Sequence, residues 1–229
     1  MSKLYIVPTP IGNLEDITLR ALRILREADI ILAEDTRVTK KLLTHYDINK
    51  PVLAYHQHNE HQQLSHFLSV IAQHNTLALV SDAGTPAISD PGFLLIRACL
   101  QNNMEVECLP GATAFVPALV NSGFPCDRFY FYGFLPHKKG RKSCIEKLSI
   151  LEETIILYES PFRLLKTLEQ LQEAMGAERK ICVSRELTKI YEENFRGTIA
   201  EAIAHFSNKT IKGEIVIVVD KMDKVEENG

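Results

Sequence analysis

The amino-acid sequence predicts an α/β fold of two domains, and three observations support this. Short apolar runs alternate with segments of helical spacing through the first half, as in a mostly parallel sheet covered by helices. Turns rich in Gly and Pro follow several of these runs. After residues 122–127 the strands become mixed in character. We therefore expect an N-terminal α/β domain over residues 1–122 and a smaller mixed α/β domain over residues 123–229.

The first half should contain five strands, each followed by a turn and a helix. The first turn, residues 8–13, lacks G-x-G-x-x-G, and no G-K-[ST] follows any strand, so neither a Rossmann site nor a nucleotide phosphate loop is supported. The expected strands are residues 4–7, 30–33, 51–55, 77–80 and 105–109; the helices start at Asp16 or Thr18 and near residues 36, 93 and 112, and another one ends near residue 74.

Residues 81–92 form a long loop between the strand at 77–80 and the helix at 93–100. Connections of this kind usually take about two to six residues. In an open α/β sheet, loops at the carboxyl ends of strands line the ligand crevice. The loop therefore predicts a small-molecule site, with a well-ordered surface turn as the alternative. Asp90-Pro91 is a good helix start, since Asp caps free N–H groups and proline suits the first turn.

Two other turns, residues 8–13 and 110–113, share the small residues of this loop and carry no Lys or Arg. Such turns favour a compact cofactor with adenine, ribose and amino-acid parts that main-chain groups bind. Residues 34–37, Glu-Asp-Thr-Arg, follow the second strand. They could be catalytic, or they could form a helix-capping and salt-bridge cluster, and the sequence leaves both open.

Two polar segments have a less specific pattern. Residues 56–61 hold three histidines, for which a polar loop with a helix start is favoured over a metal site, because no H-E-x-x-H is present. Residues 137–142, His-Lys-Lys-Gly-Arg-Lys, are the strongest basic run of the chain. This run is either a solvated loop or a patch that contacts phosphates.

The second half should form a mixed sheet. A helix is expected from Ser160-Pro161 through Leu171, and Thr198 and Glu201 fit a capping box for a short helix. The charged residues from 221 onward should be frayed. The expected strands are residues 129–134, 154–158, 180–184, 190–196 (antiparallel to the preceding strand) and 215–219.

The bulk composition is that of an ordinary globular protein. The formal net charge is −3, so a polyanion must be bound by a local patch. The five cysteines are scattered and lack C-x-x-C spacing, which argues against a disulfide framework or a structural zinc and favours the cytoplasm. No run approaches the roughly 18 apolar residues of a membrane span, and we expect neither a membrane contact nor a signal peptide.

Seven motifs carry a resemblance to a known family. They are VPTPIGNLEDITLRAL (residues 7–22), AEDTR (33–37), SDAGTPAISDPG (81–92), LPG (109–111), GFLP (133–136), YESPFR (158–163) and RELTK (185–189). Together they resemble the bacterial cytidine 2′-O-methyltransferases of small-subunit ribosomal RNA, within the tetrapyrrole (corrin/porphyrin) methylase superfamily. The resemblance covers nearly the whole chain. It implies a two-domain tetrapyrrole-methylase-like fold, a homodimer, and S-adenosylmethionine in a cleft between the domains.

The resemblance also implies the cofactor contacts. Gly84-Thr-Pro86 resembles the superfamily's Gly-Asp-Pro turn, with threonine in place of aspartate. Members of the family often carry a further C-terminal helical segment after the last strand, whereas this sequence ends at Gly229. The implied cofactor-binding residues are Ile11, Gly84, Thr85, Ile88, Thr113, Ala114, Tyr158 and Gly213.

The methyl group of a sulfonium is already activated, so the protein's main task is to position the ribose hydroxyl. A base or a charge near the developing alkoxide should help, and no metal is needed. Each candidate could instead belong to a structural ion pair. The catalytic candidates are Asp35, Glu159 and Glu186 as bases, with Arg163 and Arg185 as stabilising charges; the RNA-binding candidates are Arg37, Lys138, Lys139, Arg141, Lys142 and Lys189.

The expected partner is small-subunit ribosomal RNA or the 30S subunit. Two other functions remain open at this point. A methylase of a tetrapyrrole or other small molecule would use the same cofactor turns without needing the basic run. A non-catalytic cofactor-binding or ribosome-associated module would bind S-adenosylmethionine but transfer no methyl group.

Overall fold

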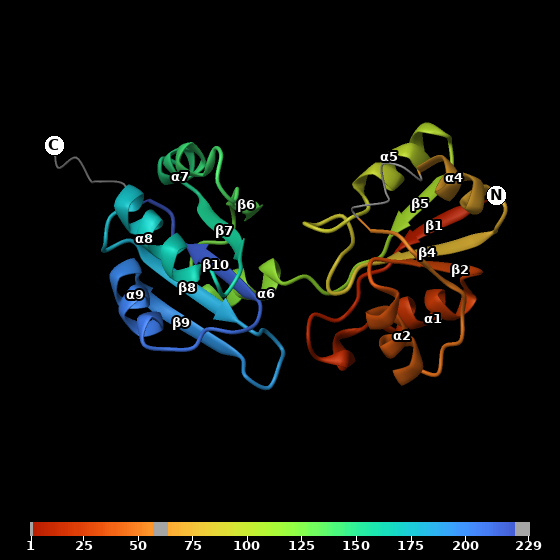
Figure 1. Ribbon diagram of the computed structural model, residues 1–229, viewed down its shortest axis with the longest axis horizontal. Coiled ribbons are helices and arrows are strands. Elements are labelled where there is room, and N and C mark those ends of the chain that lie inside the picture. Colours follow the sequence, from red (N-terminus) through yellow and green to blue (C-terminus); the bar gives the residue numbers. More distant parts are fainter. Residues whose placement is uncertain (1, 57–63, 223–229) are drawn as a thin grey trace. The chain divides into compact units, whose positions relative to one another are not determined.

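The apolar runs of the first half form one parallel sheet in the computed structural model, which describes residues 2–56 and 64–222 (Figure 1). The strand order is β3-β2-β4-β1-β5, and every neighbouring pair is parallel. The carboxyl ends of all five strands therefore lie at one edge of the sheet. The strands are β1 (Lys3–Ile6), β2 (Ile30–Ala33), β3 (Val52–Ala54), β4 (Thr76–Val80) and β5 (Glu105–Cys108).

Helices cover both faces of this sheet (Figure 1). Alternate residues of a strand point to opposite faces. In β1, Leu4 and Ile6 join the core under α4 and α5, whereas Val7, just after the strand, joins the core under α1 and α2. Burial on both faces explains why the strands are continuous apolar runs. The helices are α1 (Leu19–Glu27), α2 (Thr36–His45), α4 (Leu64–Ala72) and α5 (Phe93–Gln101), with a 3-10 turn η1 (Leu14–Asp16) before α1.

Three α-helices of this half, α1, α2 and α5, have their N-cap residue in the described part of the chain, and a side chain caps two of them. Thr18 caps α1 by accepting from the N–H of Ala21, as expected. Asp35 caps α2. The expected cap Asp90 is wrong, because α5 starts after Gly92, which has no side chain to cap with. Gly92 has a φ of 147°, which L residues rarely adopt, so the loop completes its turn there before the helix begins.

The second half forms a separate mixed sheet with the order β6-β7-β10-β8-β9. Strand β6 is parallel to β7, and the other neighbouring pairs are antiparallel. The mixed sheet and the antiparallel pairing of β8 with β9 confirm the prediction. The strands are β6 (Phe129–Phe134), β7 (Thr154–Glu159), β8 (Lys180–Arg185), β9 (Glu193–Thr198) and β10 (Ile215–Val219).

Helices α7 (Arg141–Ser149), α8 (Leu164–Met175) and α9 (Ile199–Ser207) pack on one face of this sheet, and α6 (Phe115–Ser122) packs against β8, β9 and β10. The capping box of Thr198 and Glu201 is confirmed at α9. Helix α8 starts at Leu164 with Arg163 as its cap residue, so the start predicted at Ser160-Pro161 is about one turn too early. The basic run, for which no helix was expected, leads directly into α7.

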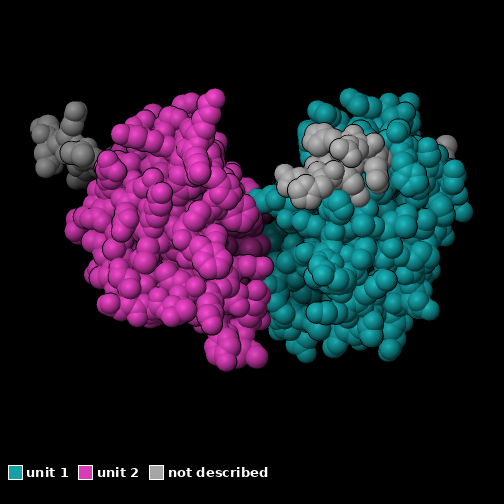
Figure 2. All heavy atoms as spheres, in the orientation of Figure 1, with its two compact units in different colours: residues 1–113 teal, residues 114–229 magenta. Residues whose placement is uncertain are grey.

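The chain divides into two compact units, residues 1–113 and 114–229 (Figure 2). The sequence placed the domain boundary after residue 122. Helix α6 accounts for the difference, because its buried residues Ala118 and Leu119 belong with the strands that follow it. We refer to these parts as the first and the second unit.

The histidine-rich segment lies mostly outside the described residues, which include only His56 of its three histidines. Among residues 2–56 and 64–222, no group of three or more His, Cys, Asp or Glu side chains could hold a metal ion. No helix in the same ranges is long and apolar enough to cross a membrane.

Candidate functional site

The turn after β1 and the loop after β4 are bonded to each other in the first unit. The N–H of Thr9 donates to the carbonyl of Gly84 at 2.9 Å, and the N–H of Gly84 donates back to the carbonyl of Thr9 at 2.9 Å. The Thr9 hydroxyl donates to the carbonyl of Ser81 at 3.0 Å. Because β1 and β4 are neighbours, these bonds continue the sheet beyond its edge.

The turn after β5 joins the same group. The Thr85 hydroxyl donates to the carbonyl of Ala112 at 3.0 Å. Gly111 lies so close to Pro8 that a Cβ at this position would be 2.5 Å from the proline Cβ, a distance that side chains do not adopt. The three turns, residues 8–13, 81–92 and 110–113, thus form one surface, which we call the three-turn site.

The three-turn site has the backbone of a binding loop. Gly84, Ala87 and Ser89 have φ values of 76°, 71° and 66°, so three residues of one loop are left-handed and two of them carry a Cβ. Such strain persists only where the surroundings enforce it, and it clusters at ligand sites. A Cβ on Gly84 would point between Ile11 and the carbonyl of Ala112, so the glycine leaves room for a group to approach the main chain.

Of the cofactor-binding residues that the sequence indicated, five lie in the three-turn site: Ile11, Gly84, Thr85, Ile88 and Thr113. Ile11 is buried beneath Gly84, and Ile88 is 39% exposed. Thr85, which replaces the usual aspartate, fastens two turns together with its hydroxyl and presents no carboxylate. The small residues and main-chain groups of this site fit an adenosine-type cofactor.

Asp35 caps a helix and pairs with an arginine. Its carboxylate accepts from the N–H of Arg37 at 2.8 Å and from the Arg37 Nη2 at 2.6 Å. The hydrogen bonds from Arg37 lower the pKa of Asp35 to about 2. Of the two interpretations that the sequence left open for residues 34–37, the capping and salt-bridge cluster describes Asp35 and Arg37.

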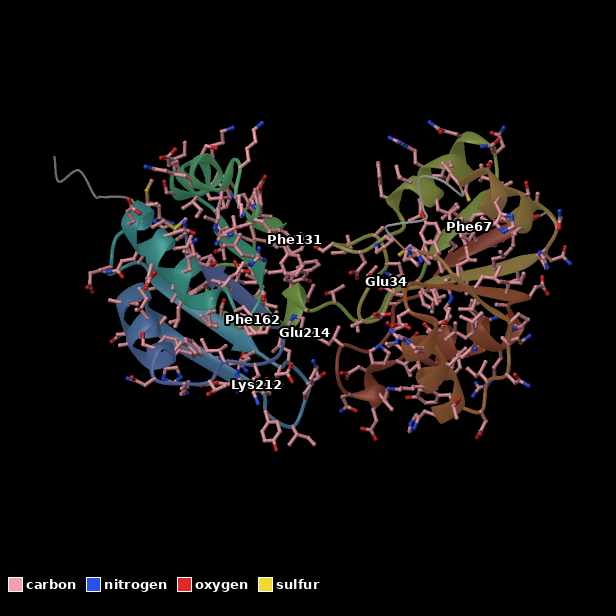
Figure 3. The ribbon with its side chains drawn as sticks, viewed as in Figure 1. Glu34, Phe67, Phe131, Phe162, Lys212 and Glu214 are labelled. Carbon is pink, nitrogen blue, oxygen red and sulfur yellow. The ribbon has the colours of Figure 1, made fainter. Side chains whose placement is uncertain are left out.

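The neighbouring acids Glu34 and Asp82 behave differently. They follow β2 and β4, which are adjacent strands, and Asp82 accepts from the N–H of Asp35 at 3.0 Å (Figure 3 labels Glu34). Burial raises the pKa of Glu34, and the charge of Asp82 adds to the effect. Burial likewise raises the pKa of Asp82. The sequence leaves a catalytic role open for residues 34–37, but the proximity of Glu34 to Asp82 could not be predicted, because it depends on the β2–β4 register.

Glu159 lies at the centre of a buried network in the second unit. Its side chain has no exposed surface, and it accepts from the Thr167 hydroxyl at 2.6 Å, the Ser160 N–H at 2.7 Å and the Arg163 Nη2 at 2.8 Å. The Arg141 Nη2 lies 3.4 Å from the same carboxylate. A carboxylate with no exposed surface and this many protein donors has no oxygen free to contact a substrate.

Arg141 is therefore a structural residue, and the expectation that it contacts RNA phosphate is wrong. Only 5% of the residue is exposed. Its guanidinium donates to Gln170 at 2.7 Å and to the carbonyl of Pro136 at 3.2 Å, in addition to Thr167 and Glu159. The other basic residues of the run, Lys138, Lys139 and Lys142, are exposed.

The segment after β8 is fastened by Glu186. This residue has a φ of 52°, and its Oε1 accepts from the Lys189 Nζ at 2.8 Å and from the Glu214 N–H at 3.0 Å (Figure 3 labels Glu214). A Cβ on Gly213 would lie 2.2 Å from the Glu186 carboxyl carbon and would displace that side chain, and the φ of 88° at this position favours glycine. Burial alone would raise the pKa of Glu186, but the hydrogen bonds outweigh it and hold the pKa below its usual value.

The second unit gathers most of its candidate residues at one edge of its sheet. Ile215, the first residue of β10, pairs with Glu159 on one side and with Arg185 on the other. Arg185 donates to Glu193 at 3.2 Å and to the carbonyl of Lys212 at 3.3 Å. Tyr158 packs its ring against Phe131 and Phe134. Also at this edge are Arg163, Glu186, Lys189 and Gly213, whereas Ala114 immediately precedes α6.

Comparisons with known proteins identify the family of this chain. Residues 3–203 match the family model described as Tetrapyrrole (Corrin/Porphyrin) Methylases. A protein of Synechocystis sp. named Ribosomal RNA small subunit methyltransferase I is 50% identical over 96% of this chain and 79% of its own length. A protein of Thermotoga maritima with the same name is 47% identical over 96% of this chain and 98% of its own length.

The solved structures extend the likeness to the fold. The crystal structure of uroporphyrin-III C-methyl transferase from Thermus thermophilus, complexed with S-adenyl homocysteine, superposes with a TM-score of 0.66. It covers 94% of this chain and 96% of its own at 19% sequence identity. The two-sheet α/β architecture is therefore one that methyltransferases of small molecules also use.

Proposed function

The chain belongs to the tetrapyrrole (corrin/porphyrin) methylases and, within them, to the ribosomal RNA small subunit methyltransferase I proteins, and from this premise we propose that it methylates small-subunit ribosomal RNA. The methyl donor is S-adenosylmethionine, and the acceptor is the 2′-hydroxyl of a cytidine. The observation that carries the proposal is the identity of 47–50% over 96% of the chain to proteins of that name. Methylation of a tetrapyrrole is supported only by the broader family model and by a likeness of fold at 19% identity.

The three-turn site is the proposed cofactor site of the first unit. Three observations support this assignment: the left-handed residues of its loop, the close contact of Gly111 with Pro8, and the space beside Gly84. From the second unit we assign Ala114, Tyr158 and Gly213. S-adenosylmethionine supplies an activated methyl group, so the residues of the chain need to bind, orient and exclude water.

Proton removal from the ribose hydroxyl is assigned to Glu34. Glu159 has no exposed side-chain surface, and hydrogen bonds lower the pKa values of Asp35 and Glu186, so these three carboxylates are not assigned to this step. Glu34 has the raised pKa that a base needs, and Asp82 links it to the loop of the three-turn site. Arg37, whose side chain is 86% exposed, and the exposed Lys138, Lys139 and Lys142 are assigned to phosphate contacts.

The test is a methyl-transfer assay with three acceptors. The protein is incubated with S-adenosylmethionine labelled on the methyl group and with small ribosomal subunits, naked small-subunit RNA or a free tetrapyrrole precursor. We expect label on ribosomal RNA, at a 2′-O-methylcytidine after nuclease digestion. Label on the tetrapyrrole alone would show that the substrate is a tetrapyrrole and not ribosomal RNA. Binding of the donor without transfer to any acceptor would indicate a non-catalytic module.

We also propose that the protein acts as a homodimer in the cytoplasm, where its substrate is found. Both assignments follow from the family rather than from contacts in the structure. Light scattering coupled to size-exclusion chromatography measures the first directly. A mass of 25.9 kDa in solution, the mass of one chain, would contradict it.

A further inference from the structure

A cavity lies within the second unit, between β6 and α7 (Figure 1 shows both elements). Its volume is about 400 Å³, within the range of 300–1,000 Å³ that is typical of small-ligand pockets. None of the residues assigned to the cofactor or to proton transfer lines it. We call it the tyrosine pocket, after the residues that dominate its wall: Tyr130 and Tyr132 of β6, Pro136, and Ser143, Cys144 and Lys147 of α7.

Two aromatic faces form one wall of the tyrosine pocket. Tyr130 and Tyr132 are two residues apart on β6, and both line the cavity. Their ring centroids are 6.4 Å apart. Tyr130 is 45% exposed, whereas Tyr132 and Cys144 of α7 both pack against the hydrophobic core of the second unit. A flat ring held at a solvent-accessible surface can stack on a nucleobase.

The rim of the tyrosine pocket is basic. Lys147 lines it, and Lys138 and Lys139 lie on the loop that leads into α7. Within the described part of the chain, none of these three lysines forms an ion pair with a carboxylate, so their charges are available to a ligand. The nearest acid on α7, Glu146, lines a different cavity, between α7 and α8.

We propose that the tyrosine pocket binds an unpaired nucleotide of the ribosomal RNA substrate, with its base on Tyr130 and its phosphate at Lys147. This inference rests on the proposed function and adds a contact distinct from the methyl-transfer site. Aromatic faces beside unpaired lysines are the combination that binds single-stranded nucleic acid without reading its sequence. An enzyme that methylates a tetrapyrrole or another small molecule at the methyl-transfer site would have no ligand for this pocket.

Binding of a fluorescent single-stranded RNA oligonucleotide, followed by anisotropy at 0.1 M salt, tests the pocket. Tyr130→Leu keeps an apolar side chain but removes the stacking face, and we expect about tenfold weaker binding. Lys147→Ala should weaken binding about threefold and reduce the salt dependence, and Lys147→Arg should restore both. Lys166→Ala, at an exposed lysine of α8 outside the pocket, is the matched control and should bind as the wild type does.

The wild-type protein offers a second readout that does not depend on the folding of a variant. Cys144 lines the pocket, whereas Cys126 is exposed outside it. Saturating RNA should slow alkylation of Cys144 at least fivefold, as measured by mass spectrometry, and leave Cys126 unchanged. Unchanged alkylation of Cys144 would contradict nucleotide binding in the tyrosine pocket. Equal RNA affinity of Tyr130→Leu and wild type would contradict it as well.

The outcome separates the two proposals. If the wild type methylates ribosomal RNA while the pocket variants bind and transfer normally, the pocket is refuted and the function stands. If the wild type transfers no methyl group to ribosomal RNA, the proposed function is wrong, whether or not RNA slows the alkylation of Cys144.

Discussion

At the scale of single residues, two glycines allow close contacts that a larger residue would prevent. Gly111 lets the turn after β5 touch Pro8, and Gly213 makes room for the carboxylate of Glu186. In both places a Cβ would meet a neighbour at 2.5 Å or less. At Gly111 the neighbour is the rigid ring of Pro8, so the backbone would have to move, whereas at Gly213 the Glu186 side chain would be displaced. In the first unit the movement would separate two of the three turns.

Replacing Gly111 by alanine should therefore damage both stability and cofactor binding. Overpacking of this kind typically costs about 1–3 kcal/mol, and the displaced turn should weaken S-adenosylmethionine binding about tenfold. Gly123→Ala is the control, because Gly123 is also at a constrained position (φ 74°) but has open space around it. That variant should lose stability only. Urea unfolding and titration calorimetry measure the two effects, and normal cofactor affinity of Gly111→Ala would contradict the assignment of the turn.

Glu34 gives a prediction about the chemical step. If it accepts the proton, Glu34→Gln should lower kcat about 100-fold and leave donor binding intact. The wild-type rate should rise with pH until it passes the raised pKa of Glu34, and the variant should lose that rise. Asp35→Ala is the comparison: it loses a helix cap worth about 1 kcal/mol and should keep most of its activity. A kcat of Glu34→Gln within threefold of wild type would remove Glu34 from the mechanism.

The sequence was informative about which segments form the site and less informative about what each side chain does. The small residues of the three turns indicated their shared location, since parallel strands end at one edge. The roles of Asp35, Glu159 and Arg141 could not be read in the same way. Each depends on partners far apart in the chain, such as Thr167 and Glu159 for Arg141, and no local pattern specifies those contacts.

At the scale of elements, the end of the second sheet is fastened by one carboxylate. Glu193 begins β9, and its side chain accepts from the Lys209 Nζ at 2.6 Å, the His205 Nε2 at 2.7 Å and the Arg185 Nε at 3.2 Å. It thereby ties β9 to β8 and to α9. Burial alone would raise the pKa of Glu193, but these hydrogen bonds outweigh it and lower the pKa to about 2.

The second unit should therefore lose stability in acid. The folded pKa of Glu193 lies below its ordinary value of 4.5, so the stabilisation is complete above pH 4.5 and disappears as the pH falls toward 2. Glu193→Gln should cost about 2 kcal/mol at pH 7 and flatten the acid limb of the stability curve. Glu169→Gln, at an exposed position of α8, is the control. Circular dichroism measures unfolding as the pH is lowered. Equal acid sensitivity of Glu193→Gln and wild type would contradict this role.

The elements that the sequence predicted well are those with a regular pattern of burial. Strand β10 is an unbroken run of five buried residues, and α9 carries a complete capping box. Helix α7 escaped detection because its first turn is basic and its cap residue, Gly140, has no side chain. Packing of Ile145 and Leu148 on the core stabilises it, and that contact is made by distant strands.

At the scale of the whole molecule, the charge is slightly negative, so RNA binding must depend on where the lysines are placed. Lys138→Ala with Lys139→Ala should reduce the slope of log K against log salt by about 1.4, because each phosphate contact on a single strand contributes about 0.7. The double variant Lys40→Ala with Lys41→Ala, on α2, changes the net charge equally and is the control. Cofactor binding should be the same in both, and equal loss of RNA affinity would indicate a general charge effect.

The order of strands in the two sheets also determines when each sheet can be completed during synthesis of the chain. Strand β1 leaves the ribosome first, but it lies between β4 and β5, so the first unit cannot close its sheet until residue 108 has emerged. In the second unit the last strand to be made, β10, is the central one, with β7 and β8 waiting on either side. Until residues 215–219 arrive, those two strands have no common neighbour and their apolar edges are open to other chains. A nascent chain stalled shortly before residue 215 would thus have a complete sheet in its first unit. Its second unit would lack the central strand and would expose strand edges that can aggregate with other chains.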